Sequence, residues 1–223
     1  MIDRTATIAR IVLDHPASAR VFQANRIDFC CGGNVTVDEI CAKKALDPAA
    51  IWAALEEALA ERSGDGTDGD VRELGTDALI ARIVDRHHGY LRKALPWLVP
   101  LATKVARVHG VKEPRLVEIR DLVVELHDLL LVHLEEEEQE LFPALVREAR
   151  DPAFVAAELE QMQAEHLEVG SRLERLRQLT DDYEAPAWGC SSYRTLFAEL
   201  GDLEGDVLRH VHLENHVLLP RFI

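Results

Sequence analysis

The sequence predicts an all-α protein in which a small helical N-terminal domain precedes an up-down-up-down four-helix bundle. Apolar residues recur at the three- and four-residue spacing of amphipathic helices along most of the chain, and strong strand signals are absent. The run SGDGTDGD at 63–70 has no apolar residue and predicts a flexible linker. We therefore expect a first domain at 1–62, the linker at 63–70 and the bundle at 71–223.

The first domain shows four short helical patterns, at 7–13, 17–25, 37–44 and 48–61. Asp47 stands as an N-cap before Pro48, a residue favoured in the first helical turn. The segment IDFCCGGNVT falls between the second and third patterns as a loop. A domain of this size has a small core, which makes packing on the other domain, or a homodimer, credible.

The second part of the chain carries four long helical patterns joined by short connections, at 76–108, 114–149, 152–179 and 191–218. Short connections between long helices place sequence neighbours antiparallel, which gives the bundle topology. We expect a kink near Pro96 in the first of these helices and find Pro143 near the end of the second.

Charge and hydropathy exclude several classes of partner. Asp and Glu number 40 against 25 Lys and Arg, a formal net charge of −15, which disfavours nucleic acid or an anionic membrane as a partner. No apolar run approaches the roughly 18 residues that span a bilayer, and the N-terminus lacks the apolar core of a signal peptide. We expect a cytoplasmic protein with reduced thiols.

Two of the long helices carry the same pattern, H-x3-E-x3-L-[FL]-P. It occurs as His133 and Glu137 in HLEEEEQELFP and as His210 and Glu214 in HVHLENHVLLP. A His and a Glu four residues apart share one helical face and can offer a nitrogen and a carboxylate to one point. One such pair on a charged helix would suit a surface contact, but the repetition with matching Leu and Pro positions favours a metal site.

The spacing of the histidines places one per helix in a common layer. In an antiparallel bundle, residues equidistant from a turn lie at the same height. The midpoints of His88 with His133, His133 with His166, and His166 with His210 all fall in the expected connections. His87 is the alternative to His88 on the first helix.

Four His and two Glu exceed the four ligands of a mononuclear zinc site and suit two ions such as iron. Each iron would take two His, Glu137 and Glu214 would bridge both ions, and an oxo or hydroxo bridge would complete the centre. This number of ligands leaves each iron with a labile position where a small molecule could bind. The two cations would also offset the cost of burying the two carboxylates.

The adjacent Cys30 and Cys31 form the second candidate site. A disulfide between neighbours is strained, so we expect free thiols, with the amides of Gly32 and Gly33 stabilising a thiolate. Such a thiolate could carry a nitrosyl group or iron from the metal site, as a thiol relay. A buried pair that only packs the loop and a vicinal redox disulfide are the alternatives.

Other candidate residues are expected to have ordinary roles. Cys41 and Cys190 stand alone and are assigned to packing. His212 is expected to face solvent, and Glu165, next to His166, is assigned to a solvated face rather than to the surroundings of a ligand.

Taken together, DFCCGG, the linker, LATKVARVHG, HLEEEEQELFP, the Glu165-His166 pair and HVHLENHVLLPR resemble the iron–sulfur cluster repair di-iron proteins. This is the Repair of Iron Centers family, of the YtfE or ScdA type, whose bundle is hemerythrin-like. The resemblance covers essentially the whole chain. It implies a non-haem di-iron centre held by His88, His133, Glu137, His166, His210 and Glu214. Some members have an acidic residue on an access path where this chain has Leu129.

The resemblance also implies a function. Members help to restore iron–sulfur clusters damaged under nitrosative or oxidative stress, by supplying iron, and they react with nitric oxide. Damaged or apo iron–sulfur proteins would then be the partners and nitric oxide a small ligand. The alternatives are a di-iron enzyme that reduces nitric oxide or detoxifies peroxide, and a sensor or carrier of nitric oxide. Stable dioxygen carriage is least favoured, because carriers of this shape usually have a fifth His.

Overall fold

The structure is a computed structural model of the chain and describes residues 2–61 and 70–222. Of the expected linker at 63–70, all but Asp70 lie outside the described residues. The described residues form helices and no strand, apart from one isolated bridge between Thr7 and Thr36, which confirms the all-α class. They divide into two compact units. The first contains the N-terminal residues to Gly75 together with Leu208–Phe222, and the second contains Thr76–Val207.

The first unit contains the four predicted short helices. They are α1 (Ile8–Asp14), α2 (Ser18–Ala24), α3 (Val37–Lys44) and α4 (Pro48–Glu61). Local chemistry fixes where they start: Thr36 and Glu39 form a reciprocal capping box at α3, and Asp47 accepts a hydrogen bond from the backbone of Ala49 at α4. Helix α3 ends at Ala45, which adopts the left-handed conformation.

A single hydrophobic core holds this unit together. Its largest members are the buried aromatic side chains of Phe22, Phe29 and Trp52, surrounded by aliphatic residues of all four helices. Leu208 packs against the same core, so the end of the chain belongs to this unit. The core is small, as predicted, because the helices are short.

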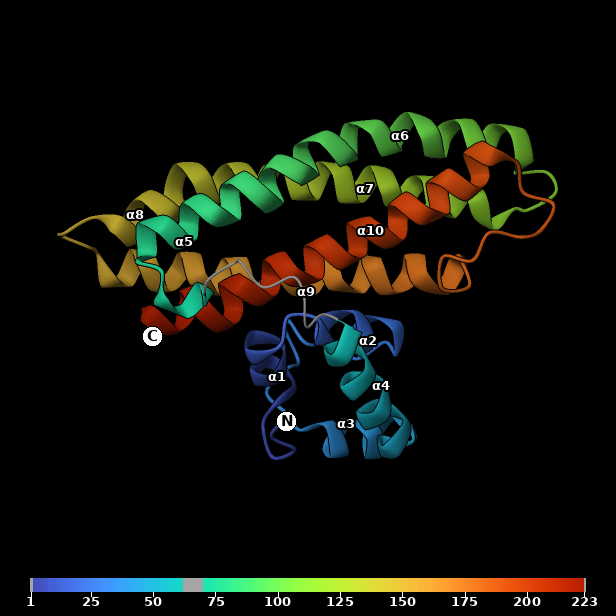
Figure 1. The fold of residues 1–223 in the computed structure, drawn as a ribbon. Helices are drawn as coiled ribbons and strands as arrows, with labels where there is room; N and C mark the ends of the chain where they lie inside the picture. Colours follow the sequence, from blue (N-terminus) through green and yellow to red (C-terminus); the bar gives the residue numbers. More distant parts are fainter. Residues whose placement is uncertain (1, 62–69, 223) are drawn as a thin grey trace. The chain divides into compact units, whose positions relative to one another are not determined.

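The second unit is the helical bundle shown in Figure 1. It contains α5 (Thr76–Ile83), α6 (Gly89–His109), α7 (Arg115–Glu136), α8 (Phe142–Val146), α9 (Pro152–Leu179) and the part of α10 (Ser191–Leu213) up to Val207. These elements follow the four predicted long helices, with α6 continuing through Pro96. The same long helix also contains an irregular turn at Val84–His88.

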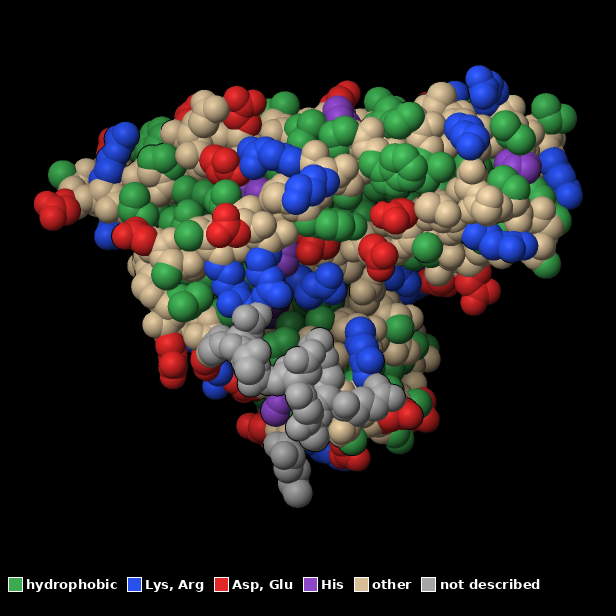
Figure 2. All heavy atoms as spheres, turned by 45° about the horizontal axis from the view of Figure 1, so that its top comes forward, with side chains coloured by type: hydrophobic (Ala, Val, Ile, Leu, Met, Phe, Trp, Pro, Cys, Tyr) green, Lys and Arg blue, Asp and Glu red, His purple; other side chains and the backbone are tan. Residues whose placement is uncertain are grey.

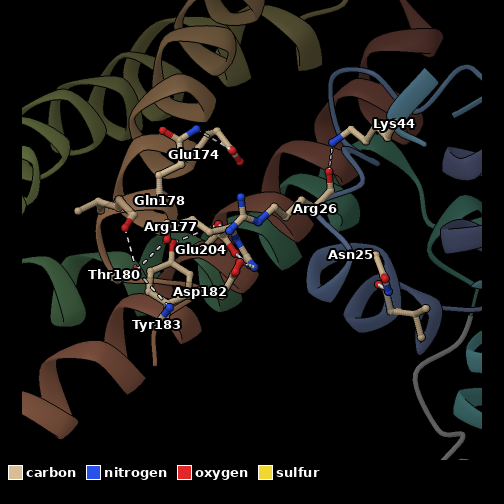
Figure 3. A network of polar contacts seen from close by, with 12 residues as sticks. Asn25, Arg26, Lys44, Glu174, Arg177, Gln178, Thr180, Asp182, Tyr183 and Glu204 are labelled. Atoms are coloured by element: carbon tan, nitrogen blue, oxygen red, sulfur yellow. Dashed lines mark hydrogen bonds and ion pairs between the residues drawn. The ribbon is translucent and has the colours of Figure 1, made fainter. Parts of the chain in front are cut away.

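Leucine side chains from all the long helices fill the bundle core, among them Leu95, Leu126, Leu173 and Leu200. The ion pair between Arg177 and Glu204 is buried within it: Arg177 Nε donates to Glu204 Oε1 at 2.9 Å, and Tyr183 Oη donates to the same oxygen (Figure 3). These bonds tie α9 to α10 next to the turn at 181–183, where three successive residues have positive φ.

Three π-helical turns interrupt the long helices, and each contains a predicted metal ligand. They are η2 (Val84–His88), η3 (Glu137–Leu141) and η4 (Glu214–Leu218). In each, the backbone N–H after the turn reaches the carbonyl five residues back, for example Phe142 to Glu137. The prolines of the repeated motif follow η3 and η4. A proline cannot donate to the carbonyl four residues back, so it loosens the preceding turn.

The surface carries a mixture of charges. Figure 2 shows acidic, basic and hydrophobic side chains interspersed on the face that it presents. Across the described residues, every helix is too short or too polar to cross a membrane.

Candidate metal centre

The carboxylate of Glu137 faces two histidines of the bundle unit. Its Oε2 lies 3.4 Å from His88 Nε2, and its Oε1 lies 3.4 Å from His133 Nε2. All three side chains are buried, with Glu137 only 2 % exposed. Each oxygen of one carboxylate therefore faces a different imidazole, which is the arrangement that a carboxylate bridging two ions requires.

Outer carboxylates fix the orientation of both histidines. Glu138 Oε1 accepts a hydrogen bond from His88 Nδ1, and Glu165 Oε2 accepts one from His133 Nδ1, each at 2.7 Å. With Nδ1 acting as the donor, a neutral ring presents the lone pair of Nε2 toward Glu137. This geometry is typical of metal-binding histidines.

The two outer carboxylates are themselves held as anions. The hydrogen bond from His133 lowers the pKa of Glu165 despite its partial burial, and Gln161 adds a further bond. Partial burial works to raise the pKa of Glu138, but hydrogen bonds from Arg92 and His88 leave it below its ordinary value. Our assignment of Glu165 to a solvated face was therefore wrong. The sequence signal for both residues is a Glu directly beside a ligand position.

His166 completes the group in the bundle unit. Its ring is buried and lies 5.1 Å from the ring of His133, in an edge-on contact. The ligand atoms of His133, Glu137 and His166 all lie within 4.8 Å of one another. Three histidines from three helices thus converge on Glu137, as the midpoint argument predicts.

The other repeat of the motif lies in the first unit. His210 Nε2 and Glu214 Oε1 are 2.7 Å apart, and both side chains are completely buried. The predicted spacing of four residues therefore brings the imidazole and the carboxylate into direct contact. A metal ion held by this pair would take the place of the shared proton.

His87 and His88 contact different carboxylates. His87 Nδ1 bonds to Asp206 Oδ1 of α10 at 3.0 Å, whereas His88 faces Glu137. His88 is therefore the better candidate ligand on this helix.

The loop that carries Cys30 and Cys31 is built around a carboxylate. Asp28 Oδ1 accepts the backbone N–H groups of Cys30 and Cys31, and its Oδ2 accepts that of Gly32. The backbone N–H of Gly32 therefore donates to Asp28 and not to a sulfur, which corrects the expectation that it stabilises a thiolate. Gly33 is required by close packing, since a Cβ there would lie 2.6 Å from the carbonyl oxygen of Phe29.

The two thiols differ in state. Cys30 is buried, and its pKa is raised well above the ordinary value by the hydrogen bond with Cys31, by burial and by the charge of Asp28. Its Sγ donates to Asp28 Oδ1 at 3.2 Å and lies 3.7 Å from Cys31 Sγ. Cys31 is half-buried. Of the pair, Cys31 is thus the thiol that a small molecule can reach.

The end of the chain holds this loop. His212 Nδ1 donates to the carbonyl of Phe29 at 2.9 Å, and His216 Nε2 donates to that of Cys30 at 2.8 Å. His212 is only 3 % exposed, and burial lowers its pKa to about 4. The expectation that His212 faces solvent was therefore wrong. The sequence could not reveal this contact, because its partner is a backbone carbonyl about 180 residues away.

A small acidic pocket opens beside the histidines of the bundle unit. It measures about 10 Å³, enough for roughly one water molecule, and is lined in part by Glu136, Glu158 and Glu165 together with His133 and Glu137. Burial and the neighbouring carboxylates raise the pKa of Glu158. Carboxylates therefore line this pocket, and Leu129 is not among its lining residues.

These groups could hold metal ions. Imidazole nitrogens and carboxylate oxygens suit iron, and ligand atoms bound about 2.0–2.2 Å from one ion lie roughly 3 Å apart, close to the separations around Glu137. The buried carboxylates and the outer carboxylate on each histidine fit a cationic centre.

Comparison with known protein families supports a metal site made of these imidazole nitrogens and carboxylate oxygens. Residues 79–222 match the model of the Hemerythrin HHE cation binding domain. Residues 4–59 match a domain of unknown function, DUF542, which contains the two adjacent cysteines.

Full-length relatives extend the comparison to the whole chain. The chain is 34% identical over 224 residues to iron-sulfur cluster repair protein ScdA of Staphylococcus haemolyticus, covering 100% of both proteins. It is 33% identical to iron-sulfur cluster repair protein YtfE of Enterobacter sp., covering 99% of this chain and 98% of that protein. It is 35% identical to the YtfE protein of Yersinia pseudotuberculosis, covering 98% and 96%. From its helical bundle, its histidines and carboxylates and these relatives, we conclude that the chain belongs to the ScdA and YtfE family of iron–sulfur cluster repair proteins.

Proposed function

We propose that His88, His133, Glu137, His166, His210 and Glu214 hold two non-haem iron ions, with Glu137 and Glu214 as bridging ligands and an oxo or hydroxo bridge between the ions. The observation that carries this proposal is that the two oxygens of Glu137 face different buried histidines. The continuity of α10 supports it, since the helix that packs in the bundle unit runs on to His210.

Metal analysis combined with Mössbauer spectroscopy tests the iron centre. We expect two irons per chain with coupled spins. Glu137→Ala and Glu214→Ala should each leave fewer than two irons per chain, because each removes a ligand that both ions share, whereas Glu135→Ala, which changes an exposed carboxylate on α7, should keep two coupled irons. A single metal ion per chain in the unmodified protein, or two coupled irons retained in both Glu→Ala variants, would contradict the proposal.

We further propose that the protein repairs iron–sulfur clusters damaged by nitrosative or oxidative stress, by donating iron, and that its centre binds nitric oxide. When bound, the two irons would supply a redox-active ligand site and a source of iron. The buried ligands and the outer carboxylates Glu138 and Glu165 would set how tightly that iron is held. Damaged or apo iron–sulfur proteins would be the partners.

Two measurements separate repair from catalysis. Iron-loaded protein should restore the cluster of a damaged iron–sulfur protein in proportion to the iron that it loses. The alternative, a nitric oxide reductase or a peroxide-detoxifying enzyme, predicts many turnovers per site under excess substrate. A yield that stops near one per site would favour donation or binding. Reversible binding without transfer of iron would instead favour a sensor or carrier.

The thiol relay remains part of the proposal, with Cys31 as the accessible member and Cys30 as its protonated neighbour. Asn215 and His216 bond to the Cys30 carbonyl, so the loop is attached to the helical turn that carries Glu214. A Cys30→Ser, Cys31→Ser double variant should restore damaged clusters more slowly, while Cys41→Ser, made in the same unit, serves as the control. Unchanged restoration by the double variant would remove the relay.

We place the protein in the cytoplasm, where iron–sulfur clients and reduced thiols occur together. The small core of the first unit keeps a homodimer credible. Sedimentation velocity on the iron-loaded protein would decide between monomer and dimer.

A further inference from the structure

We propose that Cys190 is a nucleophilic thiol, with His109 as its base, that forms mixed disulfides with low-molecular-weight disulfides. His109 Nε2 lies 3.2 Å from Cys190 Sγ, and Cys190 is exposed. The pair lies in the bundle unit and uses none of the proposed metal ligands. The exposure of Cys190 contradicts its assignment to packing, whereas Cys41 is a core residue as predicted.

The backbone places Cys190 at the N-terminus of a helix. Its carbonyl accepts the backbone N–H of Arg194, so it stands immediately before the first residue of the 23-residue helix α10. The N-terminus of a helix carries partial positive charge and stabilises a thiolate placed there. The ammonium of Lys104, on α6, lies 3.2 Å from Ser192 Oγ in the same first turn.

The base is held in place by aromatic rings. His109 is the last residue of α6, and its ring contacts those of Trp188 and Tyr193, with centroids 5.9 and 5.7 Å away. Trp188 in turn packs against Tyr193 and beneath the ammonium of Lys112, which lies 3.8 Å from its centroid. Contacts from Trp188, in the loop before α10, and from Tyr193, on α10, thus hold the imidazole with Nε2 toward the sulfur.

The other three cysteines lack this combination. Cys30 and Cys41 are buried, and their pKa values are raised. Cys31 is half-buried beside the carboxylate of Asp28. Only Cys190 joins exposure to an imidazole partner and a helix N-terminus, so it should react first with an electrophile from solution.

The disulfide reagent is the only oxidant that the reaction needs. His109 Nε2 takes the thiol proton, and Cys190 Sγ attacks one sulfur of R–S–S–R. The S–S bond of the reagent breaks as the new S–S bond forms. The thiolate RS⁻ leaves and takes up the proton, giving one mixed disulfide and one RSH.

Thiol reactivity of the full-length, metal-loaded protein tests the proposal. Stopped-flow mixing with excess 5,5′-dithiobis(2-nitrobenzoate) at neutral pH should release one fast equivalent, and peptide mass spectrometry should place it on Cys190. Oxidised glutathione should form its first adduct at the same residue. Cys190→Ser should remove the fast equivalent.

The role of His109 needs its own comparison. Because His109 Nε2 is placed to take the thiol proton as Sγ attacks, His109→Gln should slow Cys190 by about three- to tenfold. His127→Gln, which changes another partly exposed histidine, is the matched control. Circular dichroism would verify that both variants fold.

The unmodified chain provides a test that needs no variant. In the folded protein, Cys190 should react faster than the same residue does after unfolding in concentrated urea. A fast equivalent that persists in Cys190→Ser, equal rates in the two histidine variants, or a folded rate no higher than the unfolded one would each overturn the proposal.

Discussion

At the scale of single residues, the metal site depends on what stands behind each ligand. Glu138 and Glu165 each hold the Nδ1–H of a histidine, which leaves Nε2 directed at Glu137. A ring fixed in one tautomer and orientation loses less entropy when it binds a metal ion. In the proposed centre, these two carboxylates would tune how tightly iron is held.

Glu138→Gln and Glu165→Gln should each weaken iron binding by about 10- to 100-fold, because a neutral amide holds the imidazole N–H less strongly. Competition with a chelator of known affinity measures the change. Glu135→Gln, on the exposed face of α7, is the control. Wild-type affinity in both variants would mean that the outer carboxylates do not position the ligands.

At the scale of elements, contacts between sequence neighbours determine where helices begin and end, whereas the π-helical interruptions occur at the candidate metal ligands. Helix α3 begins at the cap formed by Thr36 and ends before the left-handed Ala45, and α4 begins at the cap formed by Asp47. The π-helical turns η3 and η4 instead begin at Glu137 and Glu214. A turn with one extra residue changes the direction in which the following side chains point, so these turns redirect the residues that follow the two candidate ligand carboxylates.

The end of α3 provides a test of this local control. Ala45 has a φ of 55°, a conformation that costs an alanine about 1–2 kcal/mol but costs glycine little. After allowance for the greater freedom of glycine in the unfolded chain, Ala45→Gly should raise the free energy of unfolding by about 0.5–1 kcal/mol.

Thermal and urea denaturation measure this change. Ala53→Gly, at an exposed position inside α4, should lower stability by about 1 kcal/mol and serves as the contrasting variant. A destabilised Ala45→Gly protein would show that the αL position does not limit the stability of α3.

At the scale of the whole molecule, the bundle unit combines a leucine core with a few buried charged groups. Arg177, Glu204 and Tyr183 form the network between α9 and α10 (Figure 3). Breaking a buried ion pair by removing one partner is costly, so the network fixes how these two helices meet. That register places Asp206 opposite His87 in the same unit.

The network should make the free energy of unfolding decrease at alkaline pH. Burial and the charge of Glu204 raise the pKa of Tyr183. A raised pKa in the folded state means that stability is complete below the ordinary tyrosine pKa of about 10 and falls as the pH rises above it. The loss from this group should reach about 1 kcal/mol one pH unit above 10.

Urea denaturation at several pH values between 8 and 11 measures this dependence. Tyr183→Phe should remove the part of the fall that belongs to this phenol. A fall of the same size in Tyr183→Phe and in the unmodified protein would assign the dependence to other groups.

The sequence by itself determined the helical class, the positions of the helices within a few residues, and a candidate ligand set. All three follow from periodicity; the spacing of His133 and Glu137, for example, fixes their common face before any tertiary contact exists. The tertiary structure alone decided what lies opposite those faces. It placed Glu138 and Glu165 behind the histidines, His212 against the Phe29 carbonyl and His109 beside Cys190. In each pair the two partners lie on distant segments, so a local pattern can mark a residue as a candidate, as it does for Glu138 and Glu165, but cannot say which group that residue contacts.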